Sequence, residues 1–201
     1  MTNSSRQTLA RPRALMGLTV APIAVAAALL APGTAGAVTL GSTHVSTNSQ
    51  GGIFCGEFPN CAYTQLSLPD AAVTKAPFDG RIKSFRVNLA DPGTLQLLVV
   101  RQRPNGSFRA INGSTVRTTS TKGVNTFGTN VPIRKGDLVG LNLLDEFVSV
   151  RILSPKGANE AGFLPALEMG GVQKPYAPFT SSFTELEFNA QLKRASVITP
   201  T

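Results

Sequence analysis

The chain has 201 residues, of which 42% are hydrophobic, and a formal net charge of +8 at pH 7. This is the length of one domain, and it is sufficient to bury a sizeable hydrophobic core. The one histidine and two cysteines fall short of the four ligands of a zinc site and leave little basis for histidine-dependent nucleophilic catalysis.

The first 37 residues have the three-part order of a secretory signal peptide. A region with three arginines is followed by an apolar run, residues 14–31, and by the small-residue site Ala35-Gly36-Ala37. This order predicts export and cleavage after Ala37. The alternative is an uncleaved membrane anchor, but the run is at the short end of the roughly 17–25 residues that a span requires. We therefore expect a secreted, extracellular protein with no membrane attachment after cleavage.

Residues 38–52 are rich in serine and threonine, and they contain the single histidine, His44. This composition predicts a flexible leader rather than a packed element. The folded domain is then expected at residues 53–192, followed by a C-terminal tail at residues 193–201.

Cys55 and Cys61 are the only cysteines. Because the chain is predicted to enter an oxidising compartment, we expect them to form a disulfide. The seven-residue loop from Cys55 to Cys61 contains glycine, proline and asparagine, which permit a sharp return. Loop-closure entropy for so short a loop corresponds to about 2 kcal/mol.

Alternation of apolar and polar residues predicts strands along the rest of the chain. The clearest is at residues 81–89, and residues 93–113 predict a β-hairpin whose first arm is apolar on both faces. Asn105-Gly106 is expected to supply the positive φ angles of its tight turn. Further strands are expected at residues 62–68, 138–143, 147–153 and 185–192, with weaker patterns at 73–76, 114–121 and 123–129. The side chains expected in the core are Phe85, Val87, Leu97, Val99, Leu141 and Phe188.

Residues 154–182 form the longest irregular stretch, with four prolines and four glycines. A loop of this length is functional or contains short strands that periodicity does not resolve. About eight or nine short strands with close turns predict an all-β fold, an antiparallel β-sandwich of jelly-roll type. An up-and-down barrel is the alternative.

Several motifs follow one another in a recognisable order. They are Pro77-x-Asp79-Gly80-x-Ile82, Leu97-x-Val99-Val100-Arg101, Gly136-Asp137-x-Val139-Gly140-Leu141 and Phe188-Asn189-Ala190. In this order the chain resembles a group of uncharacterised secreted bacterial β-sandwich proteins of high-GC Gram-positive organisms, over residues 61–192. Because these motifs consist of turn and strand residues, the resemblance implies the fold and brings no catalytic residues.

The charge is unevenly distributed along the chain. Eight basic residues and one acidic residue lie between Arg81 and Lys122, whereas residues 137–187 hold seven acidic and three basic residues. One interpretation is that opposite charges face each other across neighbouring strands, each exposed pair contributing about 0–1 kcal/mol. The other is a basic face that binds an anionic polymer. The candidate binding residues are Arg101, Arg103 and Arg109 around the hairpin, and Tyr176 and Phe179 in the long loop, where the two aromatic residues alternatively anchor the loop to the core.

No catalytic, metal or cofactor site is predicted. Four acids, Asp145, Glu146, Glu185 and Glu187, are candidates for paired-carboxylate glycoside cleavage. The first two fall in a turn and the last two on the outward face of a strand, where solvated acids are expected. The sequence therefore predicts a non-catalytic binding or structural module that contacts extracellular or cell-surface material. The expected partner is an anionic polysaccharide and not a nucleic acid; the alternative is a carbohydrate-active enzyme with an unrecognised carboxylate pair.

Overall fold

The computed structural model describes residues 36–45 and 51–195. The predicted signal peptide lies outside these residues except for Gly36 and Ala37, and β1 begins directly after the predicted cleavage site, at Val38. The described residues form fourteen strands and one turn of 3-10 helix, η1 (Ala177–Phe179). Nothing in this part of the chain is helical over a length that would cross a membrane.

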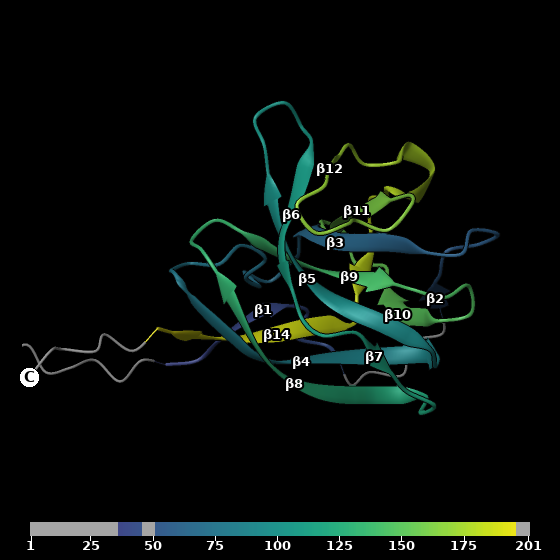
Figure 1. Cartoon of the computed structure of the whole chain (residues 1–201), viewed down its shortest axis with the longest axis horizontal. Helices are drawn as coiled ribbons and strands as arrows, with labels where there is room; N and C mark the ends of the chain where they lie inside the picture. The colour runs from purple at the N-terminus through teal and green to yellow at the C-terminus, as the bar shows by residue number, and fades with distance from the viewer. Residues whose placement is uncertain (1–35, 46–50, 196–201) are drawn as a thin grey trace, which may run out of the picture. The chain divides into compact units, whose positions relative to one another are not determined.

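The strands form two antiparallel sheets that lie as two layers in Figure 1. Sheet A is built on β4 (Gly80–Asp91), which pairs with β8 (Gly123–Ile133) along one side. Along its other side β4 pairs with β14 (Phe188–Arg194) and then with β10 (Ser149–Leu153). The remaining strands extend this side: β1 (Val38–Gly41) pairs with β14, and β2 (Gly51–Ile53) and β13 (Glu185–Leu186) pair with β10.

Sheet B runs in the order β11, β3, β9, β5, β6 and β12, and β7 also pairs with β5. The bounds are β11 (Asn159–Phe163), β3 (Cys61–Ser67), β9 (Leu138–Leu143), β5 (Thr94–Gln102), β6 (Phe108–Gly113), β12 (Val172–Gln173) and β7 (Arg117–Thr118). The predicted all-β antiparallel class is confirmed. The described strands outnumber the eight or nine expected. Several of them are only two or three residues long, which is too short for an alternation of apolar and polar residues to be recognised.

The main core lies between the two sheets. In each of β4, β14, β5 and β9, every second side chain points into the space between the sheets. There the side chains of β4 and β14 pack against those of β5 and β9. All six side chains predicted for the core are buried. The Phe85 ring lies 5.0 Å from the Phe127 ring and 6.4 Å from the Phe188 ring, measured between centroids.

A second apolar cluster covers the outer face of sheet B. Leu98 and Val100 of β5 pack there with Phe108 of β6, and the long stretch at residues 154–182 supplies Phe163 and Leu167. The prediction that β5 is apolar on both faces is therefore confirmed. The long stretch contains β11, β12 and η1, so it holds short strands of its own and follows the outside of sheet B.

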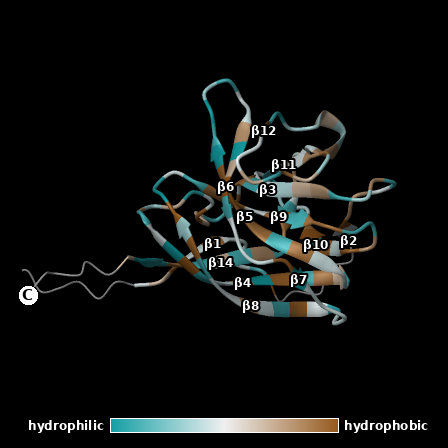
Figure 2. Ribbon diagram, viewed as in Figure 1, coloured by the Kyte–Doolittle hydropathy of each residue, from teal (hydrophilic) through white to brown (hydrophobic). Residues whose placement is uncertain are grey.

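The hairpin of β5 and β6 is confirmed, but its turn differs from the expected one. Only Gly106 of the Asn-Gly pair has a positive φ, of 78°. Gly106 N–H donates to the Arg103 carbonyl, and Arg103 N–H donates to the Ser107 carbonyl. Because Pro104 fixes a negative φ, the loop takes a type I turn followed by a left-handed glycine. The loop is hydrophilic, as Figure 2 shows.

The prediction of a flexible leader at residues 38–52 is wrong for the described part of that stretch. β1 pairs with β14 from Val38↔Leu192 to Gly41↔Asn189, and β2 pairs with β10. Leu40 of β1 is fully buried in the main core, and Val38 and Ile53 pack against it, so a few apolar residues among small ones are enough to fix these short edge strands. At the other end, β14 extends to Arg194, two residues into the predicted tail.

The predicted Cys55–Cys61 disulfide is present, with the two Cα atoms 5.4 Å apart. Both cysteines are buried at the edge of the main core. The bridge closes the loop that leads from β2 into β3, and it holds the exposed Phe54 beside it in place.

Candidate functional site

Arginine side chains gather along the seam between β6 of sheet B and β8 of sheet A. Two adjacent pockets of about 420 and 540 Å³ share Asn112 and Pro132 as lining residues. Arg101, Arg109 and Arg134 line the first, and Arg117 lines the second. We call this pair of pockets the arginine groove. Asp137 is the one acidic residue among the residues that line it.

Strand pairing and one turn bring these residues together. Arg101 of β5 and Arg109 of β6 are directly opposed across the hairpin. Arg134 lies in the turn after β8, which Gly136 closes with a φ of 88°. The same turn buries Asp137, with Asp137 N–H donating to the Arg134 carbonyl at 3.1 Å.

Asp137 is held by two arginines. Arg101 donates through Nε to Oδ1 at 2.7 Å and through Nη2 to Oδ2 at 3.0 Å, and the Arg134 backbone N–H donates to Oδ2 at 3.1 Å. Asp137 is only 1% exposed. The two hydrogen bonds from the Arg101 guanidinium therefore have to offset the free-energy cost of removing this carboxylate from water. The hydrogen bond to Asp137 raises the pKa of Arg101. This ion pair is of the kind expected from the first interpretation of the charge distribution, in which opposite charges face each other. Arg101 therefore has a structural role.

The other arginines keep unsatisfied donors. Arg109 donates through Nε to the Gly170 carbonyl at 3.2 Å, and Arg117 donates through Nη2 to the Gly128 carbonyl at 2.9 Å. Arg117 Nε is buried and has no acceptor among the described residues. The groove thus holds four guanidinium groups against one carboxylate, with donors available to an anion.

The predicted candidate residues do not form one surface. Arg101 and Arg109 line the groove, whereas Arg103 lies exposed in the hairpin loop and lines neither pocket. Tyr176 and Phe179 are also absent from the groove lining. The Phe179 ring packs against Tyr63, Phe58 and Tyr176 at centroid distances of 6.0, 6.0 and 5.5 Å. These contacts agree with the alternative interpretation, in which the two aromatic residues anchor the loop.

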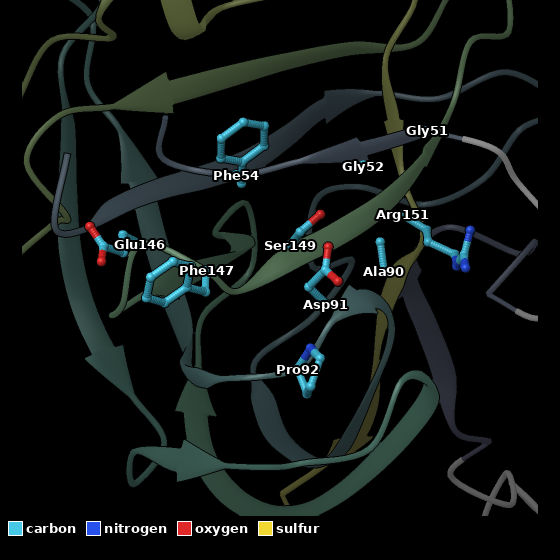
Figure 3. Close-up of a pocket in the computed structure, with 10 residues that line it drawn as sticks. All are labelled: Gly51, Gly52, Phe54, Ala90, Asp91, Pro92, Glu146, Phe147, Ser149 and Arg151. Atoms are coloured by element: carbon cyan, nitrogen blue, oxygen red, sulfur yellow. The ribbon is translucent and has the colours of Figure 1, made fainter. Parts of the chain in front are cut away.

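A larger pocket than either of those in the arginine groove lies beside β2 and β10 and measures about 650 Å³. Figure 3 shows the rings of Phe54 and Phe147 toward one end, Arg151 at the other, and Ser149 and Asp91 between them. The two phenylalanines are 52% and 73% exposed. Asp91 forms an ion pair with Lys122 at 2.8 Å. The pocket lining carries charges of both signs, because Asp91 and Glu146 lie there together with Arg151.

The expectation that Glu185 and Glu187 are solvated is wrong, because both are buried. They do point to the outer face of sheet A, as the strand parity predicts. Ser42 Oγ donates to Glu185, and His44 Nδ1 lies 3.1 Å from the same Oε1 atom. Asn88 Nδ2 donates to Glu187. The segment after β1 thus covers Glu185, which the strand pattern alone leaves exposed, whereas the side-chain partner of Glu187 comes from β4.

The other two acids lie in the turn before β10, as predicted. Asp145 accepts hydrogen bonds from the backbone N–H groups of Thr94, Phe147 and Val148, which gives it a structural role. Glu146 lines the pocket beside β2 and β10. No local pattern singles out Arg134, Arg117 or Phe54, because their sites depend on which strands become neighbours.

The described residues contain no group of three His, Cys, Asp or Glu side chains placed to hold a metal ion. Comparisons of the chain with protein-family models, with curated proteins and with solved structures found no match. The arginine groove is therefore interpreted from its own chemistry.

Proposed function

We propose that the chain is a secreted, non-catalytic β-sandwich of jelly-roll type that binds an anionic extracellular or cell-surface polysaccharide in the arginine groove. The observation that carries the proposal is the set of four arginines around two adjacent pockets with Asp137 as their one acid. The signal-peptide pattern and the Cys55–Cys61 disulfide support export.

The form of the groove favours a polymer over a single small anion. Guanidinium groups offer paired donors that match carboxylate, sulfate and phosphate oxygens. Two pockets that share lining residues provide neighbouring positions for successive anionic groups. Arg117 lines the second pocket, and clustered charge of one sign attracts a polyanion over a distance.

The proposal is tested by binding of the mature protein to immobilised polygalacturonate, with dextran as the uncharged control. Binding to polygalacturonate should weaken with salt, because the screening length falls from about 10 Å at 0.1 M to about 3 Å at 1 M. Equal retention on both polymers contradicts the proposal. Release of reducing ends from either polymer contradicts the non-catalytic part of it.

The matched variants compare the loss of two charges inside and outside the groove. Arg109→Gln with Arg134→Gln removes two exposed groove arginines, while Arg101 is left to hold Asp137. Hydrogen bonds to charged groups contribute about 1.5–3 kcal/mol each, so the affinity should fall by at least about tenfold. Arg103→Gln with Lys156→Gln removes the same charge at exposed residues outside both pockets and should bind like the parent. Equal losses in both double variants exclude the groove as the contact surface.

A further inference from the structure

A fourth pocket, of about 400 Å³, lies where the ends of β2 and β10 in sheet A approach β3 and β11 in sheet B. Its walls are mostly apolar and include Ile53, Phe54, Ile152 and Phe179. The rings of Tyr63 and Phe179 stack there, with centroids 6.0 Å apart and planes inclined by 17°. Glu160 of β11 is its one acidic lining residue, and no lysine, arginine or histidine lines it. We call it the Glu160 pocket.

β11 places the Glu160 carboxyl in this pocket. Ala161 and Phe163 of β11 pack in the outer cluster of sheet B, so Glu160, of the opposite parity, faces the space between the sheets. Glu160 pairs with Gln65 of β3 in the sheet. Glu160 lines the pocket although the residue is only 1% exposed, and both of its carboxyl oxygens are buried.

Neither carboxyl oxygen of Glu160 has a hydrogen-bond partner among the described residues. The surrounding polar groups are engaged with one another. Tyr63 Oη donates to the Phe54 carbonyl at 2.9 Å, and Thr184 Oγ1 donates to Ser181 Oγ at 2.9 Å. Gln65 Nε2, with two N–H donors, lies within hydrogen-bond distance of three backbone carbonyls, while its Oε1 accepts from Leu186 N–H. A buried carboxyl of this kind accepts hydrogen bonds only from something that enters the pocket.

We propose that the Glu160 pocket binds a primary ammonium group carried on an apolar or aromatic body. The ammonium supplies three N–H donors and the countercharge that the carboxyl lacks. The aromatic rings favour a cation near their faces and bury the apolar body. This site is separate from the arginine groove and takes a ligand of the opposite charge.

Binding of such a ligand depends on pH through Glu160. Burial raises the pKa of Glu160 to about 8, whereas an alkylammonium like that of lysine titrates near 10.4. The other titratable side chains on elements around Glu160 are Tyr63 of β3, Glu185 of β13 and Arg151 of β10. Burial raises the pKa of Tyr63, and the Glu160 charge raises it further, so Tyr63 stays neutral in this range. Glu185 is bonded to Ser42 and His44, and Arg151 lines the neighbouring pocket.

The test titrates the mature protein with 2-phenylethylamine and with the neutral isostere 2-phenylethanol in a calorimeter. Because the ionised fraction of Glu160 limits binding, the dissociation constant for the amine should fall on the order of a hundredfold from pH 6 to pH 9. At pH 6 about one proton should be released per amine bound, measured from the dependence of the heat on the buffer.

Two matched variants locate the site. Glu160→Gln should abolish both the pH dependence and the proton release, whereas Glu57→Gln, at an exposed residue outside the pocket lining, should retain both. No binding of the amine, equal affinity for amine and alcohol, or unchanged pH dependence in Glu160→Gln overturns the proposal. Polygalacturonate binding by Glu160→Gln should be unchanged, so failure at this pocket is distinguishable from failure at the groove.

Discussion

The burial of Glu160 predicts a stability that decreases as the pH rises. Its pKa is raised from 4.5 to about 8 in the folded protein. Between these values the folded chain keeps its proton on Glu160 while the unfolded chain has released it. The free energy of unfolding therefore falls by about 1.4 kcal/mol per pH unit from this residue alone. The loss is complete once the pH exceeds the folded pKa, and it amounts to about 5 kcal/mol.

Glu160→Gln isolates this contribution, because glutamine keeps the size of the side chain and cannot ionise. We expect the variant and the parent to unfold with similar free energies near pH 4.5. At pH 9 the variant should be the more stable by about 5 kcal/mol, a large part of the 5–15 kcal/mol that is typical of a folded domain. The measurement is urea unfolding followed by circular dichroism at several pH values with the disulfide intact.

The matched control is Glu57→Gln, whose side chain is exposed in the disulfide loop. Its unfolding free energy should follow the parent at every pH. If the curves for the parent and Glu160→Gln run parallel between pH 5 and pH 8, Glu160 is ionised in the folded protein. That result would refute the reasoning from its burial and lack of partners.

Two further predictions concern the fold. Phe85→Ala or Phe188→Ala should each lower the free energy of unfolding by about 3–5 kcal/mol. Phe147→Ala, at a side chain that is 73% exposed, should change it by less than about 0.5 kcal/mol. Equal midpoints of urea unfolding for all three variants would contradict the core assignment. Arg101→Met should cost about 1.5–3 kcal/mol because Asp137 loses its charged donors, and Arg103→Met, in the hairpin loop, should leave thermal unfolding unchanged. A parent-like melting curve for Arg101→Met would show that Asp137 does not depend on this pair.

The strands of the main core were predictable because their signal is local. In β4 and β14, apolar side chains alternate with polar ones, and this period of two can be read from a single strand. β5 and β9 are instead short apolar runs bounded by turn residues, which also indicate buried strands. The hairpin of β5 and β6 was equally accessible, since a glycine with positive φ marks its turn. Only the turn type differed, because Pro104 restricts the backbone before the Asn-Gly pair.

Burial of polar residues was not predictable from the same patterns. The alternation of the last strand correctly places Glu185 and Glu187 on the outer face of sheet A. It does not show whether another segment covers that face. The segment after β1 covers that face with Ser42 and His44. The small polar residues of this segment carry no alternation that would predict the contact. Contacts of this kind, between residues more than 140 positions apart in the chain, require the strand order, which the sequence does not contain locally.

The two proposed sites differ in how much of each could be predicted from the sequence. The basic side chains of the hairpin were visible in the charge distribution, and Arg101 and Arg109 do line the groove. Arg134 and Arg117 join them only because β8 lies beside β6. Glu160 had no signal at all, since β11 has the sequence Asn-Glu-Ala-Gly-Phe, which lacks the β-branched residues typical of strands.

The long stretch at residues 154–182 physically connects the two sites. Its β11 forms one edge of sheet B and its β12 forms the other, so the chain between them follows the outer face of the sheet. At the first edge it places Glu160 and Phe179 in the Glu160 pocket. At the second, the Gly170 carbonyl fixes the Arg109 guanidinium in the groove. Phe163 and Leu167 fasten the stretch between these points through the outer apolar cluster. An irregular, proline- and glycine-rich sequence suits this role, because it has to follow the sheet surface and present single groups at both edges.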